Sequence, residues 1–225
     1  LLVGLLAILN FVTLVTTVQY TRYVLPAVPF LLIWGSQSAR FFSRRVSVSS
    51  FAVAGCLGWS ILSCLWVYPH CGSYFNLVGG GPLNGHRHMI ESSIDWGQDL
   101  QYLRKWLDDH PDSRPLNFAY FGRIDPRFAG IEFQLSPSLK NASRGNGAII
   151  PEPGWYAVSV SLLHGFPWSI HDGEGGRLFV GQPQGEFDAF QHLKPVGRAG
   201  YSIYIYHVTN SDYGNLLGQD RPHDE

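Results

Sequence analysis

The stretch Tyr74–Leu100 concentrates the residue types that could carry chemistry in this chain of 225 residues. It holds three consecutive glycines at 79–81, histidines at 86 and 88, and the segment Asp95-Trp96-Gly97-Gln98-Asp99. A glycine loop can present backbone N–H groups to an anion. The run lacks the spacing of the nucleotide-binding glycine motifs, so a tight linker is the competing interpretation.

The histidines and carboxylates of this stretch invite a metal-site hypothesis. Their spacing matches no standard zinc motif, and we assign no metal site. Asp95 and Asp99 are four residues apart, so they would share one face of a helix, where they could cap its start and complement its dipole. The roles of Trp96 and Gln98, and any cofactor, stay unassigned. Spacing assembles no Ser-His-Asp or Cys-His arrangement, and no basic patch indicates a nucleic-acid partner.

A second candidate for binding is Arg22 with its neighbour Tyr23. Arg22 is the single charge between two long apolar runs. An arginine offers a rigid fork of donors that suits phosphate oxygens, so the pair could contact a lipid phosphate. The competing interpretation is an interfacial arginine that only extends its head group to water.

Charge is distributed very unevenly along the chain. Every acidic residue and every histidine lies after Pro69, and the first carboxylate belongs to Glu91. Residues 1–69 carry four arginines, and the remainder carries 12 basic against 17 acidic residues, hence a net charge of −5. This asymmetry predicts lipid around the first part and water around the second.

Three uncharged runs predict three transmembrane helices, at about 1–21, 23–39 and 51–68, since a span needs about 20 apolar residues. The loop between the second and third holds Arg40, Arg44 and Arg45. The positive-inside bias places that loop in the cytoplasm, so everything after residue 69 is expected on the exoplasmic (periplasmic) side of a multi-pass membrane protein. The three cysteines, in or beside the last run, are expected to be small packing residues.

The rest of the chain predicts a junction at 70–99, a small soluble α/β domain at 100–209 and a disordered tail at 210–225. Leucines at 100, 103 and 107 repeat at helical spacing. Strands are expected at Pro115–Gly122, Gly154–Leu163 and Gly200–Val208. A long glycine-rich loop is expected over His164–Gly185, and a short helix over Phe187–Leu193.

Several motifs resemble one known family. Arg22-Tyr-Val-Leu-Pro26 with Pro29 resembles a segment that opens a late membrane helix in glycosyltransferase family 39-like proteins, which are related to protein O-mannosyltransferases and to the lipid A aminoarabinose transferase. The run from Tyr74-Phe-Asn through Asp95-Trp-Gly-Gln-Asp-Leu100 is similar to the run after their last membrane helix. Pro195–Tyr206 is similar to their final strand. Glu91-Ser-Ser93 departs from the Asp-Ser-Asn that members often have there.

The resemblance implies an integral-membrane glycosyltransferase that moves a sugar from a polyprenyl-phosphate donor to an exoplasmic acceptor. In that family the catalytic carboxylate lies in an early exoplasmic loop. The chain, which begins with Leu1, lacks that loop and is expected to be a C-terminal portion that is inactive by itself. Only Arg22 and Tyr23 carry over, as contacts to the lipid phosphate. The alternative is a membrane-anchored exoplasmic binding or scaffold module without catalysis.

Overall fold

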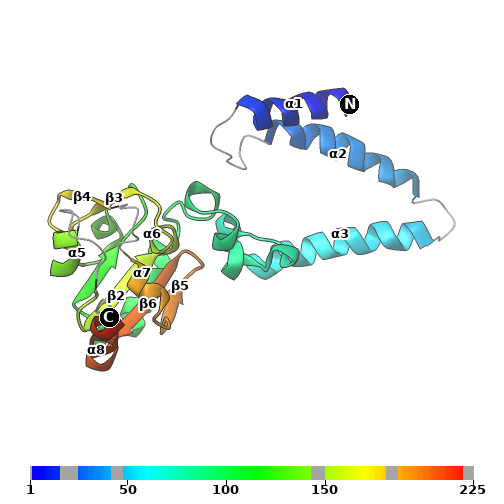
Figure 1. The fold of residues 1–225 in the computed structure, drawn as a ribbon. Helices are drawn as coiled ribbons and strands as arrows, with labels where there is room; N and C mark the ends of the chain where they lie inside the picture. Colours follow the sequence, from blue (N-terminus) through cyan, green and yellow to red (C-terminus); the bar gives the residue numbers. More distant parts are fainter. Residues whose placement is uncertain (1, 16–24, 42–47, 143–149, 181–186, 220–225) are drawn as a thin grey trace, which may run out of the picture. The chain divides into compact units, whose positions relative to one another are not determined.

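The structure is a computed structural model that describes residues 2–15, 25–41, 48–142, 150–180 and 187–219. The chain divides into two compact units, Leu1–Cys71 and Gly72–Glu225. Figure 1 shows the elements of each unit. The segment from Gly72 onward therefore belongs to the same unit as the sheet.

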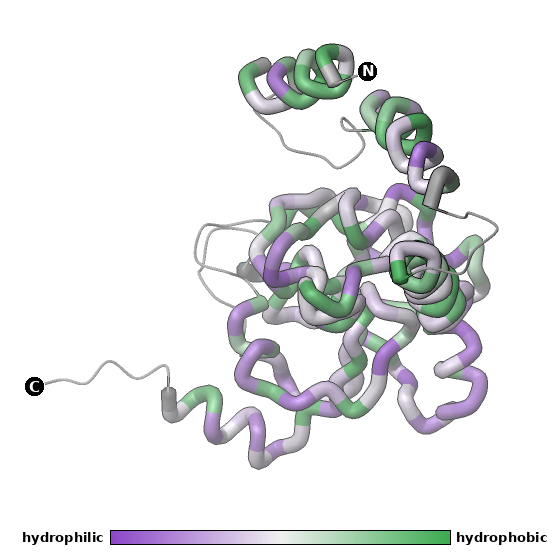
Figure 2. Tube along the Cα trace, turned by 90° about the vertical axis from the view of Figure 1, so that its right-hand side faces the viewer, coloured by the Kyte–Doolittle hydropathy of each residue, from purple (hydrophilic) through white to green (hydrophobic). Residues whose placement is uncertain are grey.

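The first unit is made of helices. α1 spans Leu2–Val15, α2 spans Val28–Ser36 and α3 spans Val48–Val67, and a 3-10 helix at Gln37–Phe41 follows α2. Figure 2 shows that hydrophobic residues dominate all three helices. Nothing in their sequences forms a polar stripe, which a helix on the surface of a soluble core would need.

Within the described residues, one helix is long and apolar enough to cross a membrane. That helix is α3, with 20 residues. At 1.5 Å per residue it is about 30 Å long, which matches the hydrocarbon core of a bilayer. α1 has 14 residues and α2 has nine, so neither reaches that length as described.

The second unit is built on a mixed four-stranded sheet with the order β1-β2-β6-β5. β1 is Leu116–Ala119, β2 is Gly154–Ser159, β5 is Gly197–Ala199 and β6 is Ile203–Val208. β1 runs parallel to β2, and the other two pairings are antiparallel. The predicted small α/β domain is confirmed.

Each face of the sheet has its own core. On one face, α4 (Leu100–Asp109) packs its leucines against alternate residues of β1 and β6. The other face is covered by residues of α5 (Pro137–Ala142), α6 (Val160–Leu163) and α7 (Asp188–Gln191). Because side chains alternate across a strand, Phe118 faces α4 while Ala119 faces the opposite core.

Two strands lie where the sequence predicts a loop. β3 (Trp168–His171) and β4 (Arg177–Val180) form an antiparallel hairpin within residues 164–185. The turn is closed by Asp172, whose Oδ1 accepts hydrogen bonds from the backbone N–H groups of residues 174, 175 and 176. The predicted strand Gly154–Leu163 also ends early, because α6 begins at Val160.

The prediction of a disordered tail is wrong for residues 210–219. They form α8 (Asn210–Gln219). The helix starts with a reciprocal cap: Thr209 N and Oγ1 both donate to Asp212 Oδ2, at 2.9 and 2.7 Å, and Asp212 N donates to Thr209 Oγ1. This pairing satisfies N–H groups that the first turn of a helix leaves unpaired.

Candidate functional site

The segment Asp95–Asp99, which we call the DWGQD segment, forms the entry to α4. Asp99 is fully buried, and its Oδ2 accepts hydrogen bonds from Tyr201 N at 3.0 Å, Ser202 N at 2.9 Å and Ser202 Oγ at 2.8 Å. Tyr201 and Ser202 lie in the turn between β5 and β6. Asp99 therefore connects the start of α4 to the β5–β6 hairpin.

This contact requires glycine at position 200. Gly200 has a φ of +58°, and a Cβ there would collide with the Asp99 carboxylate. Both the left-handed backbone and the close approach exclude other residues. The β5–β6 turn can therefore approach the Asp99 carboxylate this closely only when residue 200 is glycine.

Asp95 is a second fully buried carboxyl group. Its Oδ1 accepts a hydrogen bond from Gly97 N at 2.8 Å, which closes a tight turn. Burial, with a smaller contribution from the charge of Asp99, raises the pKa of Asp95 to about 8, although hydrogen bonds from Gly97 and Ser202 oppose the rise. At neutral pH the Asp95 carboxyl therefore holds its proton beside Asp99.

Tyr120 closes this pair of acids from the side of the sheet. Its hydroxyl donates to Gly97 O at 2.8 Å, and burial raises its pKa, with the charges of Asp95 and Asp99 adding to the rise. A Cβ at Gly97 or at Gly122 would collide with the Tyr120 ring or hydroxyl. The acids are consequently enclosed by protein and have no open face toward a substrate.

Gln98 binds the DWGQD segment to Ser73, near the start of the junction. Its Nε2 donates to Ser73 Oγ at 2.9 Å and to Ile94 O at 3.1 Å, and its Oε1 accepts from Trp96 N at 2.6 Å. Ser73 also donates to Ile94 O. Trp96 itself is 65% exposed. The segment thus connects three regions: the junction, α4 and the β5–β6 turn.

The expectation that Asp95 and Asp99 cap a helix with their side chains is wrong. Asp99 occupies the position before α4 but makes no side-chain cap hydrogen bond, and Asp95 bonds two residues ahead within a turn. Among the residues that the structure describes, no group of three histidine, cysteine, aspartate or glutamate side chains could hold a metal ion. The arrangement is a buried joint.

The glycine run uses its own N–H groups internally. Gly79 N donates to Asn76 Oδ1, Gly80 N to Leu77 O, and Gly81 N to Asn76 O. These donors are therefore engaged, and the run does not form a cradle for an anion. Gly79 ends one 3-10 helix, Leu77–Gly79, and Gly80 and Gly81 connect it to the next, Pro82–Arg87.

The two junction histidines point to different partners. His86 stacks on His164 with ring centroids 4.5 Å apart, and His88 stacks on Phe75 at 5.6 Å. Burial lowers the pKa of His86, and the neighbouring His164 lowers it further; burial also lowers the pKa of His164. The sequence gives no sign of the His86–His164 pair, because the partners are far apart along the chain.

Arg22 and Tyr23, the expected contacts to a lipid phosphate, lie outside the described residues. The sequence also did not indicate a cluster beside the β3–β4 hairpin, in which Arg127 makes a 2.6 Å ion pair with Asp125 and His171 lies 3.8 Å from the same carboxylate. The hydrogen bond from Arg127 lowers the pKa of Asp125. The charged groups of this cluster are therefore paired with one another.

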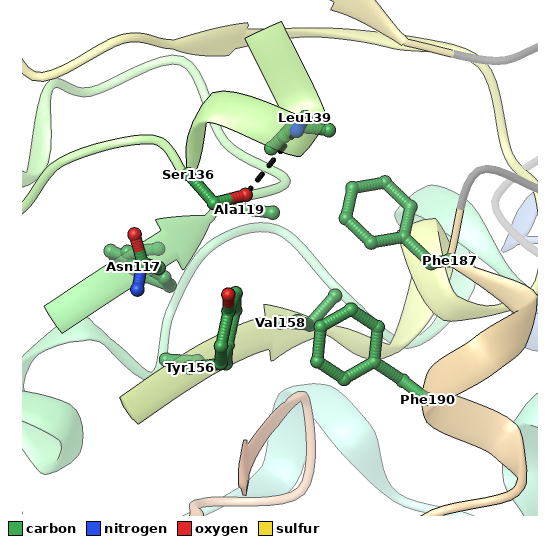
Figure 3. Close-up of a pocket in the computed structure, with 10 residues that line it drawn as sticks. Asn117, Ala119, Ser136, Leu139, Tyr156, Val158, Phe187 and Phe190 are labelled. Atoms are coloured by element: carbon green, nitrogen blue, oxygen red, sulfur yellow. Dashed lines mark hydrogen bonds between the residues drawn. The ribbon is translucent and has the colours of Figure 1, made fainter. Parts of the chain in front are cut away.

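A small cavity lies between the sheet and the helices α5 and α7 (Figure 3). Its volume is about 10 Å³, and its lining includes Asn117, Ser136, Tyr156 and Phe190. The hydroxyl of Ser136 accepts from Leu139 N at 3.3 Å, which Figure 3 draws as a dashed line. A volume of about 10–15 Å³ holds no more than one water molecule, so this is a packing gap and not a substrate site.

Comparison with protein families, with characterised proteins and with solved structures found no match to this chain.

Proposed function

We propose that the chain contributes a membrane segment and an exoplasmic α/β domain to an integral-membrane glycosyltransferase that uses a polyprenyl-phosphate-linked sugar. The observation that supports this most is the DWGQD segment. The stretch with the most specific family resemblance is also the one whose side chains connect the junction after α3 to the soluble domain. The joint lies within the unit Gly72–Glu225 and follows α3 directly along the chain, as the family resemblance places it.

In this proposal the soluble domain has a structural role and supplies no catalytic group. Both carboxylates of the DWGQD segment are buried behind Tyr120 and the β5–β6 turn. A base that activates an acceptor hydroxyl must come within hydrogen-bond reach of it. We therefore assign no catalytic residue among the described residues, and the base is expected from another part of the enzyme.

The donor contact is assigned to Arg22, with Tyr23 beside it. The guanidinium fork matches the oxygens of a lipid phosphate, and the predicted topology puts Arg22 on the same exoplasmic face as the domain. The three predicted membrane spans and their orientation are part of this proposal. α3 supports one of them by its length and composition.

The test is sugar transfer in membranes that contain the complete product of the gene, with a radiolabelled polyprenyl-phosphate sugar. Arg22→Ala should raise the apparent KM for the donor, and Arg44→Ala, in the opposite loop, should leave it unchanged. The 225-residue chain alone should show no transfer. Transfer by that chain alone, or an unchanged donor KM in Arg22→Ala, contradicts the proposal.

A membrane-anchored binding module is the second candidate, favoured by one observation. Residues 72–225 form a compact unit with a core on each face of the sheet, as an independently acting module requires. This alternative predicts that the chain binds a carbohydrate or a protein partner whether or not donor is present. Donor-dependent transfer that is lost in Arg22→Ala would exclude it.

A further inference from the structure

Large apolar side chains of the junction are turned to solvent. Val78 is 100% exposed and Leu77 is 55% exposed. The full set of exposed large apolar or aromatic residues between positions 72 and 96 is Tyr74, Leu77, Val78, Leu83, Met89 and Trp96. Six such residues within 23 positions, in a segment without a strand or an α-helix, exceed what scattered surface apolar residues explain.

The part of the junction that carries most of these side chains is an ordered pair of turns. His88 Nε2 donates to Gly79 O at 3.0 Å, and Asn84 Nδ2 donates to Gly80 O at 2.9 Å, so the two 3-10 helices are bonded to each other. We call residues 74–89 the double turn. It presents Val78 from one turn and Leu83 from the other.

Aromatic contacts hold the double turn against the domain: the Phe75 ring, and the stacking of His86 on His164. Phe75 packs on the hydrophobic core of the α7 side of the sheet and stacks with His88. A Cβ at Gly85 would meet the Phe75 ring at 2.7 Å, and one at Gly79 would meet it at 3.1 Å. Phe75 is therefore a partly buried anchor of a loop whose large apolar side chains are otherwise exposed.

Several backbone N–H groups of the double turn are hydrogen-bonded inside it. N–H groups of the glycine run and of Asn84, His88 and Met89 all donate within the double turn. Irregular backbone can enter the apolar part of a membrane only when its polar groups are satisfied, because lipid offers no hydrogen bonds. An exposed apolar surface on a turn whose glycine N–H groups are bonded internally suits insertion into a bilayer interface, where water is still present.

The charge of the double turn, and the length of chain that links it to α3, indicate that its exposed apolar residues face a membrane. The chain has no acidic residue before Glu91, and Arg87 is the one charged residue of the double turn. α3 ends at Val67, with Trp66 and Tyr68 exposed at its end, as aromatic residues are at membrane interfaces. From Val67 to Tyr74 the chain spans at most about 25 Å, since an extended residue adds about 3.3–3.6 Å.

We propose that the double turn inserts Leu77, Val78 and Leu83 into the exoplasmic leaflet of the membrane that α3 crosses, and so holds the α/β domain against the lipid surface. This inference rests on the proposed function only in that α3 lies in the bilayer with its C-terminal end on the exoplasmic side. Arg87 then meets lipid phosphates, and Trp96 lies at head-group depth. The domain is attached at two places, through the tether from α3 and through the double turn.

Environment-sensitive labels in the full-length chain, reconstituted into phospholipid vesicles, test this. A nitrobenzoxadiazole group is attached to one cysteine at a time: native Cys56 in α3 (with Cys64 and Cys71 changed to alanine), Val78→Cys in a cysteine-free background, or Ser211→Cys. The Ser211 label is the aqueous control, because α8 lies away from the junction in Figure 1. Quenching is compared between lipids brominated near the head group, lipids brominated near the chain end, and aqueous iodide.

The label at Val78 should be blue-shifted relative to the label at Ser211, and quenched by the shallow bromines but not by iodide. The label at Cys56 should be quenched by the deep bromines. If Cys56 is deep but Val78 behaves as Ser211 does, the insertion of the double turn is overturned and the proposed function is not. If Cys56 is reached by iodide, the membrane placement beneath both proposals fails.

A variant pair separates insertion from a general loss of structure. Leu77→Ser with Leu83→Ser should move the label at Val78 toward water, while Leu217→Ser on α8, a residue of similar exposure, should not. Far-ultraviolet circular dichroism confirms that each variant keeps its fold. An unshifted label at Val78 in the Leu77→Ser/Leu83→Ser variant overturns the inference.

Discussion

Replacing Asp95 with asparagine should stabilise the domain increasingly as the pH rises. The folded protein keeps this carboxyl protonated up to about pH 8, whereas in the unfolded chain it ionises near pH 3.9. Between these values the folded state binds the extra proton, so the free energy of unfolding falls as the pH increases. The contribution of Asp95 is largest below about pH 4 and is lost progressively up to about pH 8.

The magnitude follows from the shift. One pKa unit corresponds to about 1.4 kcal/mol, so this single group lowers the free energy of unfolding by about 4 kcal/mol between pH 5 and pH 8. Asparagine has no proton to lose, and its amide oxygen can still accept the hydrogen bond from Gly97 N. The variant should therefore lack this slope.

Urea unfolding of the detergent-solubilised chain, followed by tryptophan fluorescence at four pH values from 5 to 8, measures the difference. With a slope of about 2 kcal/mol/M, the midpoint of Asp95→Asn should gain about 2 M on the wild type across this range. Asp109→Asn, an exposed residue at the end of α4, is the matched control and should follow the wild type. Curves for Asp95→Asn that run parallel to the wild type over the whole range refute the reasoning.

Three further substitutions test the joint, each by urea unfolding or proteolysis. Asp99→Ala removes an acceptor of three hydrogen bonds and should lower the free energy of unfolding by about 3–5 kcal/mol, with Asp99→Asn losing clearly less; equal losses would contradict the hydrogen-bond account. Gly200→Ala collides with Asp99 and should destabilise by more than about 2 kcal/mol, whereas Gly214→Ala, with open space in α8, should be neutral or stabilising by up to about 1 kcal/mol; similar effects would refute the steric argument. Gln98→Ala should expose the junction to limited proteolysis, unlike Gln101→Ala on the exposed face of α4; identical cleavage rates would count against the tie.

The sequence pattern predicted those helices and strands that are determined by the spacing of their own residues. The leucines of α4 repeat every three or four residues, and they are buried as that spacing requires. The strand ending at Val208 was visible for the same reason, since its residues alternate. The hairpin β3–β4 was missed because the many glycines of residues 164–185 favoured a loop, and because the hydrogen bonds of Asp172 that close its turn are not visible in the pattern.

The sequence indicated where in the chain the candidate site lies, but it did not indicate which residues its side chains contact. The composition of Tyr74–Leu100 marked it, and its glycines and carboxylates favoured anion binding or helix capping. The actual partner of Asp99 lies 103 positions away, at Ser202, and no spacing rule reaches so far. Burial decides the state of Asp95, and a single sequence does not reveal which of two neighbouring carboxyls will be enclosed.

The separation of Asp99 from Ser202 also sets an order of events during synthesis. Asp99 leaves the ribosome 103 residues ahead of its partner, which takes about 5 to 20 s at ordinary rates of elongation. All of α3 is therefore synthesised before the joint behind it can close. Only a chain translated through Ser202 can form the hydrogen bonds that hold Asp99, so a chain that stops earlier keeps this carboxyl without its partners in the β5–β6 turn.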